Sequence, residues 1–182
     1  MKRALLALFL LGTVGGTAAA APPRGEVERL LAGYEVPARG DDWKRLGPGV
    51  DRVLVTIALD PQASPIRRNR ALSALALFPS SEGRELLRAV VRDHRGAKEG
   101  MELVDLVAAV RAFGGFGESA ATDLVPLLTH SHPDVRATAA LALGRAGAVS
   151  ATGSLQLRLT VERDEEVVAA LRRAVATLQA PR

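Results

Sequence analysis

Apolar residues recur at helical spacing through most of this chain, and the stretches that separate them contain glycine, proline or serine. An amphipathic helix repeats its apolar residues at positions i, i+3, i+4, i+7 and i+8, so that they share one face. The first complete set consists of Val50, Val53, Leu54, Ile57 and Ala58. The pattern therefore predicts a helix over this stretch, with one buried side, that ends before the next proline.

Seven further segments carry the same periodicity. Several of them begin near proline or serine, and three end near glycine, as helices commonly do. The predicted helices span residues 65–77, 82–92, 101–113, 119–129, 133–147, 148–162 and 164–178.

Two of these segments carry conflicting signals. Pro126 lies inside 119–129, where a proline loses a helical hydrogen bond and clashes with the preceding turn, so a kink or a late start is expected. In 148–162, Leu155, Leu157 and Leu159 alternate as in a strand, although Leu155 and Leu159 also fit a helix. The helical context favours a helix there.

The N-terminal part before residue 50 is less regular. One amphipathic pattern between Pro22 and Pro37 predicts a short helix, and residues 38–49, rich in glycine, proline and aspartate, predict a loop. Together, residues 21–49 are interpreted as a cap. Trp43 is either an exposed binding residue or a cover for the open apolar end of the first repeat, and stacked arrays need such a cover.

A repeat becomes visible when the second helix of each predicted pair is aligned. A small residue is followed four positions later by a large one in three pairs, and the alanines lie 38 and then 30 residues apart: Ala71/Leu75, Ala109/Phe113 and Ala139/Leu143. The small residue allows two helices to approach closely, and the large one fills the groove beside it. Residues 50–182 are therefore predicted to form an all-α solenoid of about four antiparallel helix pairs.

The best copy resembles the HEAT repeat family, specifically the short HEAT-like repeats first associated with phycobilisome lyases. Asp134-Val135-Arg136, followed by Ala139 and Leu143-Gly144, matches the family's second-helix pattern. The resemblance implies that Asp134 and Arg136 belong to a polar ladder between repeats, and that the protein is a binding scaffold. The other copies depart from the pattern at the equivalent positions: Arg67-Arg68, Asp105-Leu106 and Val167-Val168.

The first 20 residues have the features of a secretory signal peptide. Lys2 and Arg3 precede a mostly apolar run, and small residues follow it, with the cut expected before Ala21. The apolar run is too short for a comfortable membrane span, so no membrane span is expected after cleavage. The predicted location is periplasmic or secreted.

Charge and composition narrow the classes of function. The net charge of +4 falls to +2 without Lys2 and Arg3, and the sequence lacks a basic tail, so nucleic-acid binding is not expected. Cysteine is absent, which excludes disulfides and thiolate metal sites.

Other candidate motifs have simpler structural interpretations. His130 and His132 lack a third ligand nearby and suit a helix-capping turn. Residues 114–117 lack the spacing and the lysine of a phosphate loop and suit a helix-ending turn. Four arginines at helical spacing could form a basic stripe for acidic partners, but such a row is more often a solvated helix face, and that interpretation is preferred: Arg84, Arg88, Arg92 and Arg95.

The sequence therefore predicts an exported, noncatalytic protein-binding scaffold with no cofactor or metal. A bilin-lyase-like enzyme or enzyme subunit and a structural envelope component remain as alternatives. If a partner binds the inner side of the stack, the second helices supply the contacts. The candidate partner-binding residues are Arg67, Arg68, Asp105, Arg136, Arg172 and Arg173.

Overall fold

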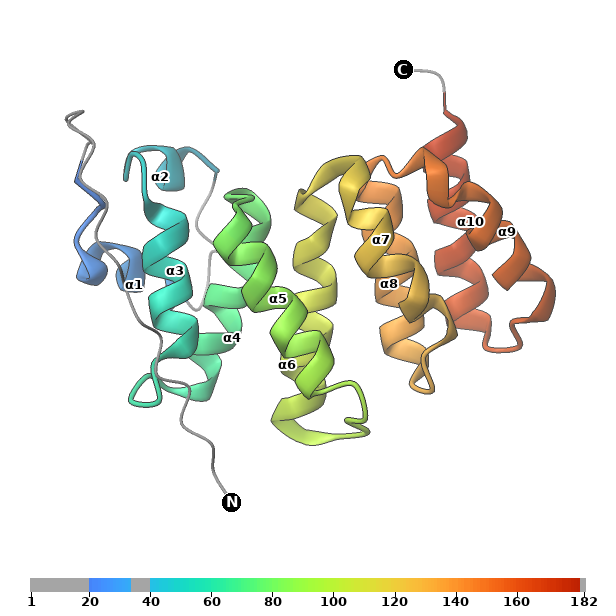
Figure 1. The fold of residues 1–182 in the computed structure, drawn as a ribbon, viewed down its shortest axis with the longest axis horizontal. Coiled ribbons are helices and arrows are strands. Elements are labelled where there is room, and N and C mark those ends of the chain that lie inside the picture. The colour runs from blue at the N-terminus through green and yellow to red at the C-terminus, as the bar shows by residue number, and fades with distance from the viewer. Residues whose placement is uncertain (1–19, 34–39, 181–182) are drawn as a thin grey trace.

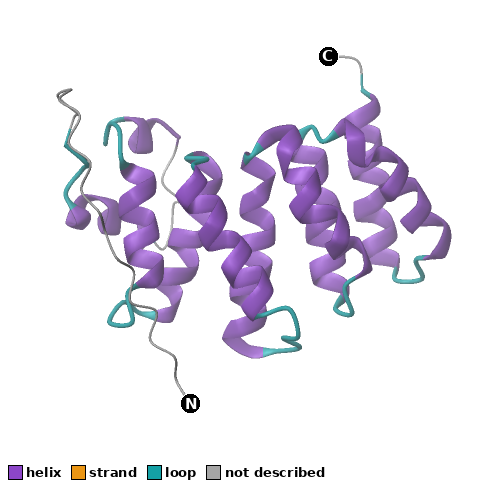
Figure 2. Ribbon diagram, in the orientation of Figure 1, coloured by secondary structure: helices purple, strands orange, loops and turns teal. Residues whose placement is uncertain are grey.

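A computed structural model describes residues 20–33 and 40–180. The predicted signal peptide lies outside these residues, except for Ala20. Helices and loops make up the whole of the described part, without a strand (Figure 2). The α-helices are α1 (Arg24–Ala32), α2 (Gly40–Lys44), α3 (Val50–Leu59), α4 (Pro65–Ala74), α5 (Ser81–Asp93), α6 (Gly100–Ala112), α7 (Ala121–Leu124), α8 (Pro133–Ala146), α9 (Thr152–Val161) and α10 (Glu165–Gln179). The 3₁₀ segments are η1 (Leu75–Leu77), η2 (Phe113–Gly115), η3 (Gly117–Ala120), η4 (Val125–Thr129) and η5 (Val149–Ala151).

From α3 onward the helices stack in two rows that follow chain order along the long axis (Figure 1). The first helices α3, α5, α7 with η4, and α9 form one row. The second helices α4, α6, α8 and α10 form the other, and each packs against the next. This arrangement confirms the predicted all-α solenoid of four helix pairs, with α1 packed beside α3 and α4 at one end.

Small and large residues on the second helices build the core as the repeat pattern predicts. Ala109, Ala139 and Leu143 are completely buried. At Gly144, a Cβ atom would lie 3.1 Å from the Cα of Ala174, so α8 and α10 pack with almost no side chain between them at this point. The residues that carry the repeat therefore form the contacts between repeats.

Residues 119–129 do not form one helix. The chain passes from η3 through α7 into η4, and Pro126 lies in the first turn of η4. A proline has no N–H to continue the α-helical ladder, and the tighter 3₁₀ turn accommodates it at its start. The predicted disruption at Pro126 therefore appears as a change of helix type.

The ambiguous segment 148–162 is helical, as η5 followed by α9. Leu155 is completely buried, whereas Leu157 is 71% exposed. The alternating leucines therefore reflect one buried position and an exposed apolar side chain, and the helical interpretation is confirmed.

The segment 38–49, expected to be a loop, contains the short helix α2. Asp41 lies 3.2 Å from Lys44, one turn away. Trp43 is only 5% exposed and meets Phe78 edge-on, with the ring centroids 5.8 Å apart. Burial of Trp43 against the first repeat accounts for a helical turn that local composition did not indicate.

Gly115 marks the closest approach between the first two repeats. A Cβ atom at this position would lie 2.7 Å from the carbonyl carbon of Ala76 and 2.8 Å from its Cα. Glycine is required here for space, since η1 and η2 pack backbone against backbone.

Within residues 20–33 and 40–180, none of the helices has the length and apolar content needed to cross a membrane.

Candidate functional site

Polar side chains join each repeat to the next. Asn69 donates to the backbone carbonyl of Val104 (3.1 Å) and to Asp105 (3.0 Å), linking α4 to α6. Arg145 donates to the carbonyl of Arg111 (2.8 Å), linking α8 to α6. These contacts span 34 to 36 residues, which is close to the repeat length in the sequence.

Arg136 and Glu162 form the best-defined polar contact between the last two repeats. Two nitrogens of Arg136 donate to the two carboxylate oxygens of Glu162, at 2.8 and 2.9 Å. Glu162 also accepts from Arg158 at 2.7 Å and from the backbone N–H groups of Arg163 and Asp164.

These donors stabilise the ionised form of Glu162. The Glu162 side chain is 2% exposed, and that of Arg136 12%. The hydrogen bonds from Arg136, and then those from Arg158 and the two backbone groups, hold the pKa of Glu162 well below its ordinary value despite burial. Arg136 therefore acts at the junction of two repeats.

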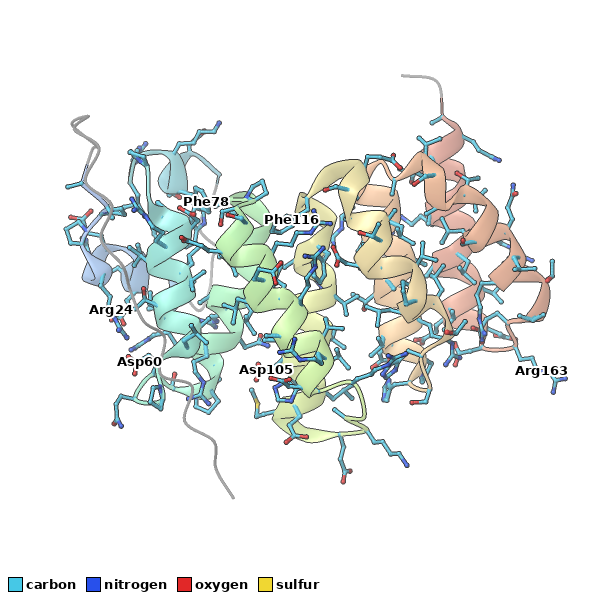
Figure 3. All side chains as sticks on the ribbon, viewed as in Figure 1. Arg24, Asp60, Phe78, Asp105, Phe116 and Arg163 are labelled. Atoms are coloured by element: carbon cyan, nitrogen blue, oxygen red, sulfur yellow. The ribbon has the colours of Figure 1, made fainter. Side chains whose placement is uncertain are left out.

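The predicted surface residues near the N-terminal end are also engaged within the fold. Arg68 donates to the carbonyl of Ala63 at 3.1 Å, and Arg67 lies 3.9 Å from Glu28 of α1. Asp105 accepts the bond from Asn69 described above (Figure 3). These residues are distributed along α4 and α6.

Asp134 and Arg172 are exposed on α8 and α10. Asp134 lies 4.0 Å from His132, whose ring also accepts from the Asp134 N–H. Asp134 is thus placed at the start of its own helix, whereas Arg136 reaches across to the next repeat.

A groove of about 350 Å³ crosses the second helices α6, α8 and α10. Three arginines lie along it, one from each helix. Of the predicted surface residues, only Arg173 contributes to it. The groove is lined by Arg111, Thr138, Leu141, Gly144, Arg145, Arg173, Ala174 and Thr177.

The lining of this groove contains cationic side chains and no carboxylate. Within the described part of the chain, Arg111, Arg145 and Arg173 form no ion pair. Partial burial, together with the nearby positive charge of Arg111, lowers the pKa of Arg145. The groove is therefore an electropositive site formed by three successive repeats.

Two arginines of the first-helix row, Arg84 and Arg88, are paired across a repeat junction. Arg84 and Arg88 both donate to Asp123, at 2.5–2.9 Å and 2.7 Å, and join α5 to α7. The Arg84 side chain is mostly buried, and its guanidinium lies 5.9 Å from the centre of the Phe116 ring. These two members of the arginine row connect repeats, while Arg92 and Arg95 are exposed.

The two histidines form a capped turn. His132 caps α8 by accepting from the N–H of Asp134. Buried His130 accepts from the His132 N–H at 3.0 Å, so its other ring nitrogen donates to the carbonyl of Arg95 at 2.6 Å. In the described residues no cluster of histidine, aspartate or glutamate is placed to hold a metal ion.

Arg111 and Arg145 were missed by sequence reasoning, although a signal was present. Both lie in the last turn of a second helix, two or three residues before a glycine, and they are 34 residues apart. A basic residue recurring at the repeat length and at the same place in its helix would have identified them.

The family model for HEAT repeats matches residues 104–176, from α6 into α10, and so includes all three groove arginines. No curated protein and no solved structure gives a significant match to this chain.

Proposed function

This chain belongs to the HEAT repeat family, and from that premise we propose that it is an exported, noncatalytic scaffold that binds a partner protein. HEAT repeats generally mediate interactions between proteins. Such repeats act by presenting an extended surface to which several units contribute. The family and the shape of the fold therefore support a binding role.

One observation carries the choice of surface. The groove on α6, α8 and α10 receives an arginine from each of three successive repeats. Arginine suits interfaces because its planar guanidinium donates several hydrogen bonds and also packs against apolar groups. The second-helix row is thus the proposed partner-binding face.

Site-specific photo-cross-linking in the native organism tests this surface. A photoreactive residue at Thr177, on α10 in the groove, is expected to give a cross-link to one discrete protein. The matched control places the same residue at Thr122, which is exposed on α7 in the opposite row. Equal cross-linking at both positions, or none at Thr177, would contradict the proposed face.

Export is tested separately by the mature N-terminus. The basic, apolar and small-residue segments of residues 1–20 support cleavage before Ala21. Intact-mass and N-terminal analysis of the protein from the envelope or periplasmic fraction should give a chain that starts at Ala21. Recovery of an uncut chain from the cytoplasm would contradict export and leave the binding proposal standing.

A further inference from the structure

We propose that the groove on α6, α8 and α10 binds an acidic peptide segment of the partner, whose carboxylates pair with Arg111, Arg145 and Arg173. The proposal rests on the proposed function, because it names the chemistry recognised by that same face. Guanidinium and carboxylate groups match each other in charge and in the geometry of paired hydrogen bonds.

The ion pairs of the first-helix row support the proposal that the groove binds an acidic ligand. Arg84 and Arg88 of α5 receive their carboxylate from Asp123 of the neighbouring repeat. The groove arginines receive none from the described part of the chain, whereas Arg136, on the same row, is paired with Glu162. An anionic ligand would supply to the groove arginines the negative charge that Asp123 supplies to Arg84 and Arg88.

The surroundings of Arg145 explain why the groove should bind an anion more favourably than water. Its guanidinium is held against the end of α6 by the bond to the Arg111 carbonyl, close to the positive charge of Arg111. A carboxylate entering the groove would interact favourably with both charges. Because the bond already fixes the side chain, little conformational entropy remains to be lost on binding.

The layout of the groove favours a peptide over a small anion. Arg111 and Arg145 lie on the α6 side of α8, whereas Arg173 and Thr177 belong to α10 on its other side. Leu141 of α8 also lines the groove and provides apolar surface. Packed helices lie about 8–10 Å apart and an extended chain advances about 3.3 Å per residue, so carboxylates three positions apart would reach both sides.

Calorimetric titration of the purified protein tests the assignment. The probe is a nine-residue peptide of glycine and serine with glutamate at every third position, and the control peptide carries glutamine in place of glutamate. The glutamate peptide is expected to bind at least about tenfold more tightly, and to bind more weakly as salt concentration rises. Equal binding of both peptides, or failure of the glutamate peptide to bind, would overturn the proposal.

Charge-neutral variants locate the binding. Arg173→Gln and Arg111→Gln should each weaken binding of the glutamate peptide about tenfold. The matched controls are Arg172→Gln, the neighbouring exposed arginine on α10, and Arg163→Gln, which points away at the end of the molecule (Figure 3). Both controls should change affinity less than twofold, and an equal loss in Arg172→Gln would overturn the groove as the site.

Two measurements distinguish acidic-peptide binding from a small-anion site and from a loss of folding in the variants. Inorganic phosphate that displaces the peptide at equal concentration would show a small-anion site and overturn the peptide assignment. Thermal unfolding of each variant, followed by circular dichroism, should match the unmodified protein, because the three arginines form no ion pair in the described chain. If the glutamate peptide does not bind but the cross-link from Thr177 is still obtained, the proposed partner-binding face is retained and the preference for acidic peptides is rejected.

Discussion

Single residues decide how closely the repeats approach, and Gly115 is the most constrained. Its missing Cβ leaves room for the backbone of Ala76 from the preceding repeat. Gly115→Ala should therefore lower the free energy of unfolding by about 3 kcal/mol, because overpacking against backbone has no flexible side chain to move. Chemical denaturation measures the change.

Gly153 provides the matched control for this substitution. It lies in α9 with open space where a Cβ would be added. Gly153→Ala should keep or raise stability, by up to about 1 kcal/mol, because alanine has the higher helix propensity. If Gly153→Ala lowered the free energy of unfolding as much as Gly115→Ala, the effect at Gly115 would not be due to its contact with Ala76.

Leu143 represents the large residue of the repeat pattern. It is completely buried on α8. Leu143→Ala should cost about 2–5 kcal/mol through lost burial and the cavity it leaves. Leu157→Ala, at an exposed leucine of α9, should cost less than about 0.5 kcal/mol. Similar losses at both positions in urea unfolding would refute the assignment of Leu143 to the core.

Polar contacts between repeats fix the positions of neighbouring helices, and Glu162 makes such contacts between the last two repeats. Its carboxylate joins Arg136 of α8 to Arg158 of α9 just before α10 begins. Glu162→Gln should lower the free energy of unfolding by about 2–3 kcal/mol at neutral pH, because charged hydrogen bonds are replaced by weaker ones.

The pH dependence of stability provides the second readout at Glu162. Its pKa lies below the ordinary value in the folded protein, mainly because Arg136 donates to it. The unfolded chain therefore takes up a proton first as the pH falls, so this stabilisation is complete above about pH 4.5 and is lost below it. Between pH 7 and 3, the unmodified protein should lose more stability than Glu162→Gln, whereas Glu165→Gln at an exposed site should follow the unmodified curve.

The elements show where sequence reasoning succeeds and where it stops. Helices α3, α8 and α10 follow strong apolar periodicity with clear boundary residues, and all three were predicted. The turn at α2 was missed, because burial of Trp43 against Phe78 is a tertiary contact. The change of helix type at Pro126 was predicted as a disruption, since proline acts through local covalent geometry, but its form depends on the packing of α7 and η4.

At the scale of the whole molecule, the repeat predicted the stack but not its functional site. The spacing between alanines identified which helices pack together, because closely packed helices require small side chains at the point of contact. The groove depends on side-chain direction on three separate helices, and the direction of Arg145 is fixed by its bond to the Arg111 carbonyl of the preceding repeat. Residue type and spacing do not determine that direction.

Stability along the stack should be uneven, because each repeat contacts only its neighbours. Helix α8 has α6 on one side and α10 on the other, while α1 packs at one end of the array. Hydrogen exchange followed by mass spectrometry should therefore show slower amide exchange in α8 than in α1. Equal protection across both helices would indicate one cooperative unit in place of a chain of coupled repeats.

The contact between Gly115 and Ala76 also limits how far the stack of helices can bend when a ligand binds. Two backbones in direct contact leave no compressible layer of side chains between them. That joint is stiff, and the approach of Gly144 to Ala174 between α8 and α10 is also close, so the stack should bend little at either of these joints when a ligand binds. A ligand of the groove would therefore have to fit the existing curvature of the second-helix row, because close backbone packing at these joints limits adjustment.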